Sequence, residues 1–424
     1  MKTTHSRLNL SLLTTATIGL TLLSLTGGAA LAARWTITDL GALGATGDAV
    51  FTSEGWNINN SGQVAGKGVV LTNGVSEMHY VVWSNGTQID LGIRLNSSLV
   101  NTAPINDAGQ VAGIDAENSR SFLWQTGVIT WLPWLTGTTV ARVAGINAGG
   151  MVAGYNRIPW GGGQAYESVL WQGGTVTDLH LPYGHIATAI SDSDALAIMI
   201  NYSGQRSYVL TGSSTNVVEW PGLPVSGGTG ALDLNNAGQV CGWFTFEGAV
   251  DLHAFLWPGG AGTPLPEFPN GGSKAVALNN LGHAVGSAYR AANDNPAVLW
   301  RDGTMTSLND LPEVVAAGWS ALEAHDINDQ DQIVGHGYHG DFVRAFLLSP
   351  AAAPSAFSLT ITCSGTNVVL QFPTETGFNY DVRSKTSLTD TNWELLIRIP
   401  GTGSTQSVTD PATNTTRFYR VMVP

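Results

Sequence analysis

The sequence predicts an all-β protein in which a seven-bladed β-propeller is followed by a small β-sandwich. Three observations support this fold class. A nine-residue pattern occurs seven times at intervals of 41 to 49 residues. Glycine contributes 52 of 424 residues, and charged residues make up only 12% of the chain, about half of the usual quarter. Few charges, many glycines and 14 tryptophans are typical of short strands joined by tight turns.

The repeated pattern is clearest in INNSGQVAG, which begins at Ile58. The second position is Asn in six copies and Ser in a degenerate one, ISDSDALAI. Each copy is followed by an apolar segment such as SVLW, which ends at Trp171, then by a Gly turn and a segment such as TVTDL. The second positions are Asn59, Asn106, Asn147, Ser191, Asn235, Asn279 and Asn328.

Each unit is predicted to form four short strands. Asn-x-x-Gly predicts a hairpin turn with its Gly in the left-handed region of φ. Asp194 and Asp331 replace that Gly in two copies, and Asp tolerates the same conformation. Four strands in about 44 residues is the size of a propeller blade.

The two ends of the repeat region complement each other. The seventh unit reaches Pro350 without a fourth strand, while 35–41 (WTITDLG) resembles a fourth strand that belongs to no unit. We therefore expect the N-terminal strand to complete the last blade, which removes exposed sheet edges. The propeller is predicted to span residues 34–349.

Residues 1–33 have the pattern of a cleaved secretory signal peptide. Lys2 and Arg7 precede an apolar run, and 30–32 (ALA) supplies small residues for cleavage. A membrane anchor is the alternative, less favoured because the run is rich in Thr and Ser. The sequence thus predicts a secreted protein, extracellular or periplasmic, with no transmembrane segment in the mature chain. The net charge of −13 argues against nucleic-acid binding.

Residues 350–356 are rich in Pro and Ala and predict a linker. Strand-like runs then recur about every ten residues through 357–424, which predicts a small β-sandwich. Cys241 and Cys363 fall on opposite sides of this boundary and are interpreted as separate buried thiols. A disulfide between them is the alternative in an exported protein.

The repeat signature, together with the segment 253–257 (HAFLW), resembles an extracellular repeat family that is named HAF after the first three residues of that segment. The resemblance covers nearly all of residues 34–349. It implies an exported bacterial repeat protein and no shared chemistry. The C-terminal segment is similar to fibronectin type III-like or immunoglobulin-like modules at Tyr380, Trp393 and 418–420 (FYR).

Aromatic residues fall into two groups. Tryptophans that recur in the units, such as Trp257 and Trp300, are expected to pack between blades. Non-repeating aromatics are predicted to lie in loops that share one face, where Tyr183 and Trp319 accompany the expected binding residues. Ordinary loop packing is the alternative for this set. The expected binding residues are Tyr155, Trp160, Tyr166, Trp243, Phe244, Tyr289 and Tyr338.

The sequence predicts no catalytic residues, no cofactor and no metal site. His325, His336 and His339 are interpreted as solvated loop histidines rather than metal ligands. The acids within 326–331 (DINDQD) are assigned to turn chemistry rather than to calcium.

The predicted function is that of a monomeric, non-catalytic recognition or envelope scaffold protein that binds a neutral glycan or a cell-surface protein. The alternative is a propeller glycoside hydrolase or lyase acting in the central well. Two or three carboxylates converging on the channel would favour that alternative.

Overall fold

The protein is described by a computed structural model. The chain divides into two compact units, one spanning Trp35–Pro350 and the other containing Ala351–Pro424, and each is described by itself. The described residues are 35–43, 52–72, 74–95, 102–115, 117–138, 140–160, 163–200, 206–218, 228–246, 251–269, 271–291, 294–351, 357–364, 367–375, 378–387, 389, 393–411 and 417–423.

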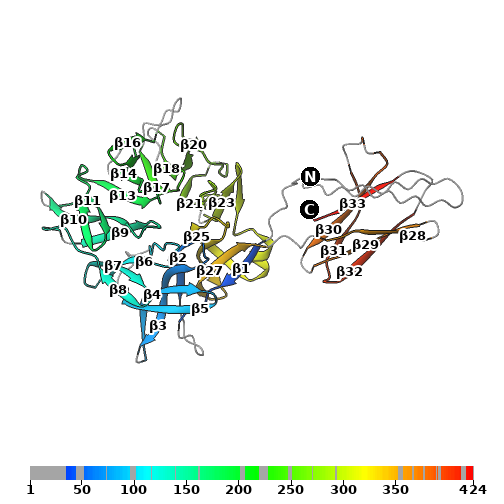
Figure 1. Cartoon of the computed structure of the whole chain (residues 1–424), viewed down its shortest axis with the longest axis horizontal. Coiled ribbons are helices and arrows are strands. Elements are labelled where there is room, and N and C mark those ends of the chain that lie inside the picture. The colour runs from blue at the N-terminus through cyan, green and yellow to red at the C-terminus, as the bar shows by residue number, and fades with distance from the viewer. Residues whose placement is uncertain are drawn as a thin grey trace. The chain divides into compact units, whose positions relative to one another are not determined.

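Seven antiparallel sheets follow one another through the described part of Trp35–Pro350 (Figure 1), and we number them I to VII. Sheet I holds β2 (Ser53–Ile58), β3 (Val64–Thr72), β4 (Val75–Ser84) and β5 (Thr87–Arg94). Sheet II holds β6 (Val111–Asp115), β7 (Arg120–Gln125) and β8 (Val128–Trp131). Sheet III holds β9 (Val140–Ile146), β10 (Val152–Trp160), β11 (Gly163–Gln172) and β12 (Thr175–Asp178).

The remaining four sheets of this unit each have four strands. Sheet IV holds β13 (His185–Ile190), β14 (Leu196–Ile200), β15 (Tyr208–Thr211) and β16 (Ser214–Val217). Sheet V holds β17 (Thr229–Leu234), β18 (Val240–Phe244), β19 (His253–Trp257) and β20 (Thr263–Pro264). Sheet VI holds β21 (Ser273–Leu278), β22 (Ala284–Ala288), β23 (Ala297–Arg301) and β24 (Thr304–Ser307). Sheet VII holds β25 (Trp319–Ile327), β26 (Ile333–His339), β27 (Phe342–Pro350) and β1 (Trp35–Asp39).

The all-β class is confirmed. The helical content of the described residues is a single short helix, α1 (Pro312–Ala316). Sheet II differs from the other six in having three strands, because an isolated bridge between Ile105 and Val111 stands where a first strand is expected. None of the described helical structure has the length and apolar character needed to cross a bilayer.

The expected pairing of the N-terminal strand is confirmed. β1 pairs antiparallel with β27, from Trp35 opposite Pro350 to Asp39 opposite Phe346. The indole of Trp35 is buried, so this strand contributes to the core as well as to the sheet. The pairing covers an edge of β27 that would otherwise expose unpaired peptide groups.

The turn predicted for Asn-x-x-Gly is also confirmed. Gly238 has a φ of 78°, and its N–H donates to the Asn235 carbonyl over 3.0 Å. Asp194 and Asp331 take the same place with φ values of 63° and 57°. The left-handed backbone is kept where the glycine is replaced, because Asp tolerates this region better than most residues.

The second glycine of the motif has a different role. The first strands of sheets I and III–VII each contain a β-bulge. In sheet V the Gly230 carbonyl lies so close to Gly242 that a Cβ on Gly242 would overlap with that oxygen. This glycine is therefore required by close approach and not by its φ. The same clash with a first-strand carbonyl applies to Gly66, Gly154, Gly286 and Gly335.

The repeated tryptophans are buried, as predicted. Trp257 packs in one cluster with Val209 of sheet IV and Val240 of sheet V. Such side chains join neighbouring sheets through apolar contact. The exposed fractions run from 1% to 7%, for Trp83, Trp124, Trp171, Trp257 and Trp300.

The second unit contains two three-stranded sheets. One holds β28 (Thr360–Ser364), β29 (Asn367–Pro373) and β32 (Thr405–Pro411), and the other holds β31 (Glu394–Pro400), β30 (Asn379–Lys385) and β33 (Phe418–Met422). Two sheets that share one core are the arrangement expected of a small sandwich. Both sheets contribute to one hydrophobic cluster, built on Val368, Leu370, Phe372, Tyr380 and Val382.

Some of the predictions concern residues outside the described ranges. The signal peptide at 1–33 and positions 352–356 of the linker lie outside the described residues, as does the side chain of Cys363. Cys241 is a buried free thiol.

Candidate functional site

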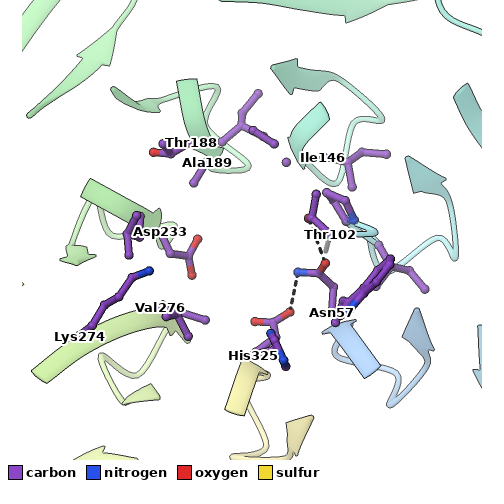
Figure 2. A pocket seen from close by; sticks show the side chains of 18 residues that line it. Asn57, Thr102, Ile146, Thr188, Ala189, Asp233, Lys274, Val276 and His325 are labelled. Atoms are coloured by element: carbon purple, nitrogen blue, oxygen red, sulfur yellow. Dashed lines mark hydrogen bonds between the residues drawn. The ribbon is translucent and has the colours of Figure 1, made fainter. Parts of the chain in front are cut away.

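A cavity of about 430 Å³ is lined by one segment from each of the seven repeat units. The segments belong to the first strands or, in sheet II, to residues 102–105 that precede β6. Figure 2 shows these segments arranged around the opening, which we call the central cavity. Every unit contributes the same part of its sequence, so variation at that part decides the chemistry of the cavity.

Two carboxylates line the central cavity, Asp233 from β17 and Asp326 from β25. Both stand two positions before the motif Asn. Asp326 lies within a strand, next to the bulge at Ala324/Asp326, so its assignment to turn chemistry is wrong. The other units carry residues without a carboxylate at this position, namely Asn57, Pro104, Gly145, Ala189 and Ala277.

Main-chain N–H groups bind both oxygens of each carboxylate. Asp233 accepts from its neighbour Leu234 over 2.8 Å and from Leu278 of sheet VI over 2.9 Å. Asp326 accepts from Ile327 over 2.8 Å and from Ile58 of sheet I over 2.9 Å. Asp233 thus joins its own sheet to the next one along the chain, and Asp326 joins the last sheet to the first.

The side chain of Asn57 makes a similar link. Its Nδ2 donates to Asp326 over 3.3 Å (Figure 2), and its Oδ1 accepts from the Ala103 N–H over 3.0 Å. The position two before the motif Asn is therefore a place where a short polar side chain bridges neighbouring units. Where this position holds Pro, Gly or Ala, no side chain forms the bridge.

Enclosure in the cavity raises the pKa of both carboxyl groups, although the main-chain donors oppose the effect. The pKa of Asp233 rises to about 6, and that of Asp326 rises to about 7 because the negative charge of Asp233 adds to the cost of desolvation. The two acids are therefore close enough to influence each other. Lys274 also lines the cavity, on the side of Asp233 (Figure 2), and desolvation lowers its pKa.

Histidines approach the same cavity from sheet VII. His325 lines the cavity, and its Nε2 lies 3.0 Å from Nδ1 of His336 on β26. Desolvation and the nearby His336 lower the pKa of His325 to about 4. His325 and His336 lie in strands, so their interpretation as solvated loop histidines is wrong. His339 also lies in a strand but is separate from them, because it stacks on Trp319 and contacts Asp39 over 2.8 Å.

The Asn turns surround a second, smaller cavity of about 190 Å³. The buried Nδ2 of Asn59 donates to the Asn106 carbonyl of the next unit over 2.9 Å. Nδ2 of Asn147 donates instead to the Asp194 carboxylate over 2.7 Å. The repeated Asn thus links units as well as shaping its own turn. The contact of Asn59 with a carbonyl recurs from Asn106 to Asn147, Asn235 to Asn279, Asn279 to Asn328, and Asn328 to Asn59.

Ser191 of sheet IV has no amide side chain that could make this contact. The link between sheets IV and V is formed by the next residue of each turn, Asp192 and Asn236. The Asp192 N–H donates to Oδ1 of Asn236 over 2.8 Å, and Nδ2 of Asn236 donates back to Asp192 over 2.7 Å. All seven neighbouring pairs of units, counting the last with the first, are consequently linked by side-chain hydrogen bonds at this end of the sheets.

The predicted binding residues lie mostly in strands rather than in loops. Phe244 is 1% exposed within β18 and belongs to the hydrophobic cluster of sheets IV and V, so its assignment to a binding face is wrong. Tyr155 and Tyr166 are half-buried on β10 and β11 and make an edge-to-face contact at 5.2 Å. Trp243 is half-buried on β18.

Two of the predicted binding residues are exposed. Tyr289, just beyond β22, is 43% exposed, and Tyr338 on β26 is 49% exposed. Both lie toward the end of a second strand, away from the Asn turns. Of the accompanying aromatics, Tyr183 is exposed and Trp319 is buried. Trp160 ends β10, and its side chain lies outside the described residues.

The sequence patterns alone did not indicate the cavity-lining residues Asp233 and Lys274 or the pairing of His325 with His336. A signal was available for the acids, because Asp interrupts a position otherwise filled by Asn, Pro, Gly or Ala. No such signal existed for the histidines, which meet only through the bulge and the register of β25 and β26.

No family model matches the chain, and neither does any curated protein. Among solved structures, a dipeptidyl peptidase 4 of Porphyromonas gingivalis aligns with a TM-score of 0.37 at 8% identity. That alignment covers 75% of this chain and 57% of the peptidase, a little more than half of its length. The polysaccharide lyase Uly1 aligns with a TM-score of 0.35 at 8% identity, over 68% of this chain and 87% of the lyase. A Trypanosoma rangeli sialidase aligns with a TM-score of 0.31 at 10% identity, over 87% of this chain and 83% of the sialidase. Likenesses this distant assign no activity.

Proposed function

We propose that the protein is an exported, non-catalytic recognition or scaffold protein whose residues 34–349 close into a seven-bladed β-propeller, with a small β-sandwich at 357–424. The seven sheets, the pairing of β1 with β27 and the links between all neighbouring units support the closed propeller. The basic and apolar pattern of residues 1–33 supports export to the periplasm or beyond the cell.

The observation that carries the non-catalytic assignment is the hydrogen bonding of the cavity carboxylates. Asp233 and Asp326 accept two main-chain hydrogen bonds each, one of them from a neighbouring sheet. A general acid, base or nucleophile needs an oxygen directed at substrate. The main-chain donors hold each carboxylate in place as a link between sheets, which supports a structural role.

The recognition surface is assigned to the end of the sheets opposite the Asn turns. Tyr289 and Tyr338 are exposed there. Tyr166 and Trp243 are half-buried toward the same end of their sheets. Exposed aromatic rings on a chain with only 12% charged residues suit a neutral glycan or a protein surface better than a phosphorylated ligand.

The test is a glycan-array and cell-surface binding screen of the mature chain as a monomer. Tyr289→Ala and Tyr338→Ala should each weaken any binding at least about tenfold while leaving the unfolding midpoint unchanged, since exposed side chains contribute little to the core. Val128→Ser is the matched control, because Val128 is exposed at the start of β8, at the end of the sheets that carries the Asn turns. Binding that survives both tyrosine changes would contradict this surface.

A propeller glycoside hydrolase or lyase is the second candidate, favoured by one observation. Two carboxyl groups with raised pKa values converge on the central cavity, and a raised pKa allows a carboxyl group to donate a proton near neutral pH. Release of reducing ends or of unsaturated sugars from a polysaccharide panel, lost in Asp326→Asn and Asp233→Asn, would establish this function over the first.

A further inference from the structure

One face of sheet VII carries three side chains suited to metal binding. Glu323 on β25 and His336 on β26 are Cα partners, so their side chains lie on the same face of the sheet. His325 occupies the extra position of the bulge between Ala324 and Asp326, and its ring stacks on that of His336 with centroids 5.1 Å apart. Register and bulge together assemble a set that the spacing of the histidines in the sequence does not suggest.

The donor atoms of these side chains lie within one coordination sphere of each other. One ligand atom from each of Glu323, His325 and His336 can be chosen so that all lie within 4.8 Å. Nε2 of His325 lies 3.0 Å from Nδ1 of His336, close to the separation of about 3.3 Å between two nitrogens on a tetrahedral zinc ion. Nε2 of His336, the other ring nitrogen, lies 3.8 Å from the Glu323 carboxylate. One imidazole binds a zinc ion through one nitrogen, so the ion takes Nδ1 of His336 together with Nε2 of His325, and the Glu323 carboxylate must turn toward that position. Small rotations of the exposed Glu323 side chain would complete the set.

The positive charge near these ligands is already balanced. Among the described residues, Lys67 of β3 is the cation that acts electrostatically on His325. Its ammonium lies 2.9 Å from the Glu54 carboxylate. Glu54 in turn interacts electrostatically with His336 and accepts from the indole N–H of Trp56 over 3.2 Å. A divalent cation would therefore meet a neighbouring ion pair and not an isolated positive charge.

We propose that Glu323, His325 and His336 form a Zn²⁺ site at the wall of the central cavity. Two imidazole nitrogens and one carboxylate oxygen are a donor set that zinc prefers, and three protein ligands leave a fourth tetrahedral position for solvent. His325 lines the cavity, so water that enters the cavity supplies that ligand. The site departs from the expectation that these histidines hold no metal. It is independent of the recognition surface proposed above, and either proposal can fail without the other.

The first test measures zinc affinity on the full mature chain after removal of any affinity tag. The protein is stripped with EDTA and titrated with Zn²⁺ against a chromogenic chelator. We expect one Zn²⁺ per chain with a Kd of about 10 μM or tighter, as for a site with three protein ligands. Co²⁺ in place of zinc should give the visible absorption of a four-coordinate ion. A chain that binds no Zn²⁺ below about 100 μM would overturn the proposal.

The second test assigns the ligands. His336→Ala and Glu323→Gln should each weaken Zn²⁺ binding at least about tenfold and alter the Co²⁺ spectrum, because a ligand is lost. His180→Ala is the control, since that side chain is 85% exposed after β12 of sheet III and the variant should bind zinc like the parent. If His336→Ala fails to fold, Glu323→Gln still decides the question, because the Glu323 side chain is 68% exposed. If Glu323→Gln binds Zn²⁺ with the affinity of the parent and gives the same Co²⁺ spectrum, the proposed site is wrong.

Discussion

Nδ2 of Asn328 donates a hydrogen bond to the main-chain carbonyl of Asn59 over 3.0 Å, although the two residues are 269 positions apart. Consecutive units make the same contact elsewhere, as Asn59 does with Asn106. The last unit therefore contacts the first in the same way as four of the six pairs of consecutive units contact each other. The hydrogen bond from the Ile58 N–H to Asp326 is a second contact of this kind, since Leu278 and Asp233 make its equivalent between sheets V and VI.

The amide of Asn328 should contribute a measurable part of the stability. Its Oδ1 accepts from the N–H groups of Gln330 and Gln332, and its Nδ2 donates to Asn59. Asn328→Ala leaves the two N–H groups without this acceptor and leaves the Asn59 carbonyl with the Gly62 N–H as its remaining donor, so the free energy of unfolding should fall by about 1–3 kcal/mol. Urea unfolding followed by tryptophan fluorescence measures the change. Gln330→Ala should be near neutral, because residue 330 is exposed and only its main chain takes part in these bonds. A loss equal to that of Asn328→Ala would contradict the assigned role.

Two glycines of sheet V should respond differently to alanine. A Cβ on Gly238 would meet open space, so Gly238→Ala costs only the strain of left-handed backbone, about 1–2 kcal/mol. A Cβ on Gly242 would collide with the Gly230 carbonyl, so Gly242→Ala must distort the bulge and should cost about 3 kcal/mol or above. Gly238→Val should be worse than Gly238→Asp, since Asp occupies the equivalent position at Asp194. A lower unfolding midpoint for Gly238→Ala than for Gly242→Ala would contradict the roles assigned to these two glycines.

Stability should depend on pH through Asp233. Enclosure raises its pKa from 3.8 to about 6, so the folded protein holds this proton more tightly than the unfolded chain does. Its contribution to the free energy of unfolding is therefore full below about pH 4 and is lost as the pH rises through 6. Asp233→Ala, which introduces the residue that sheets IV and VI carry at this position, should remove this contribution. The substitution also removes a negative charge that raises the pKa of Asp326. The lower pKa of Asp326 in the variant further reduces the pH dependence of its stability.

Urea unfolding of the parent and of Asp233→Ala at a series of pH values measures this dependence. The free energy of unfolding of the parent minus that of the variant should fall by about 1–3 kcal/mol between pH 4 and pH 7. A difference that stays constant, or that grows with pH, would contradict the raised pKa.

The fold was largely predictable because its determinants are local and repeated. Asn-x-x-Gly determines a turn within four residues, and the seven copies of the repeat, two of them with Asp in place of the Gly, determine the number of sheets. The segment 35–41 was predictable for the same reason, as a repeat element without a unit of its own. The role of the Asn side chain between units was not predictable, since the turn and the contact with the next unit use the same residue.

The cavity was less predictable because its chemistry depends on departures from the repeat. Asp233 and Asp326 differ from their equivalents at one position, and only the bulge reveals that this position faces the cavity. Phe244 shows the opposite error. It does not repeat, which suggested a ligand contact, yet β18 extends far enough to bury its ring in the cluster of sheets IV and V.

Closure of the repeat region by the N-terminal strand is the central claim, and a designed disulfide tests it most directly. Thr36 and Ser349 are Cα partners across β1 and β27. Thr36→Cys combined with Ser349→Cys should form an intramolecular disulfide in the monomer, identified by mass spectrometry of the linked peptides. Thr36→Cys with Ser214→Cys, a residue of sheet IV, is the control and should remain reduced. Failure of the first pair to link, or links found only between chains, would contradict closure by the N-terminal strand.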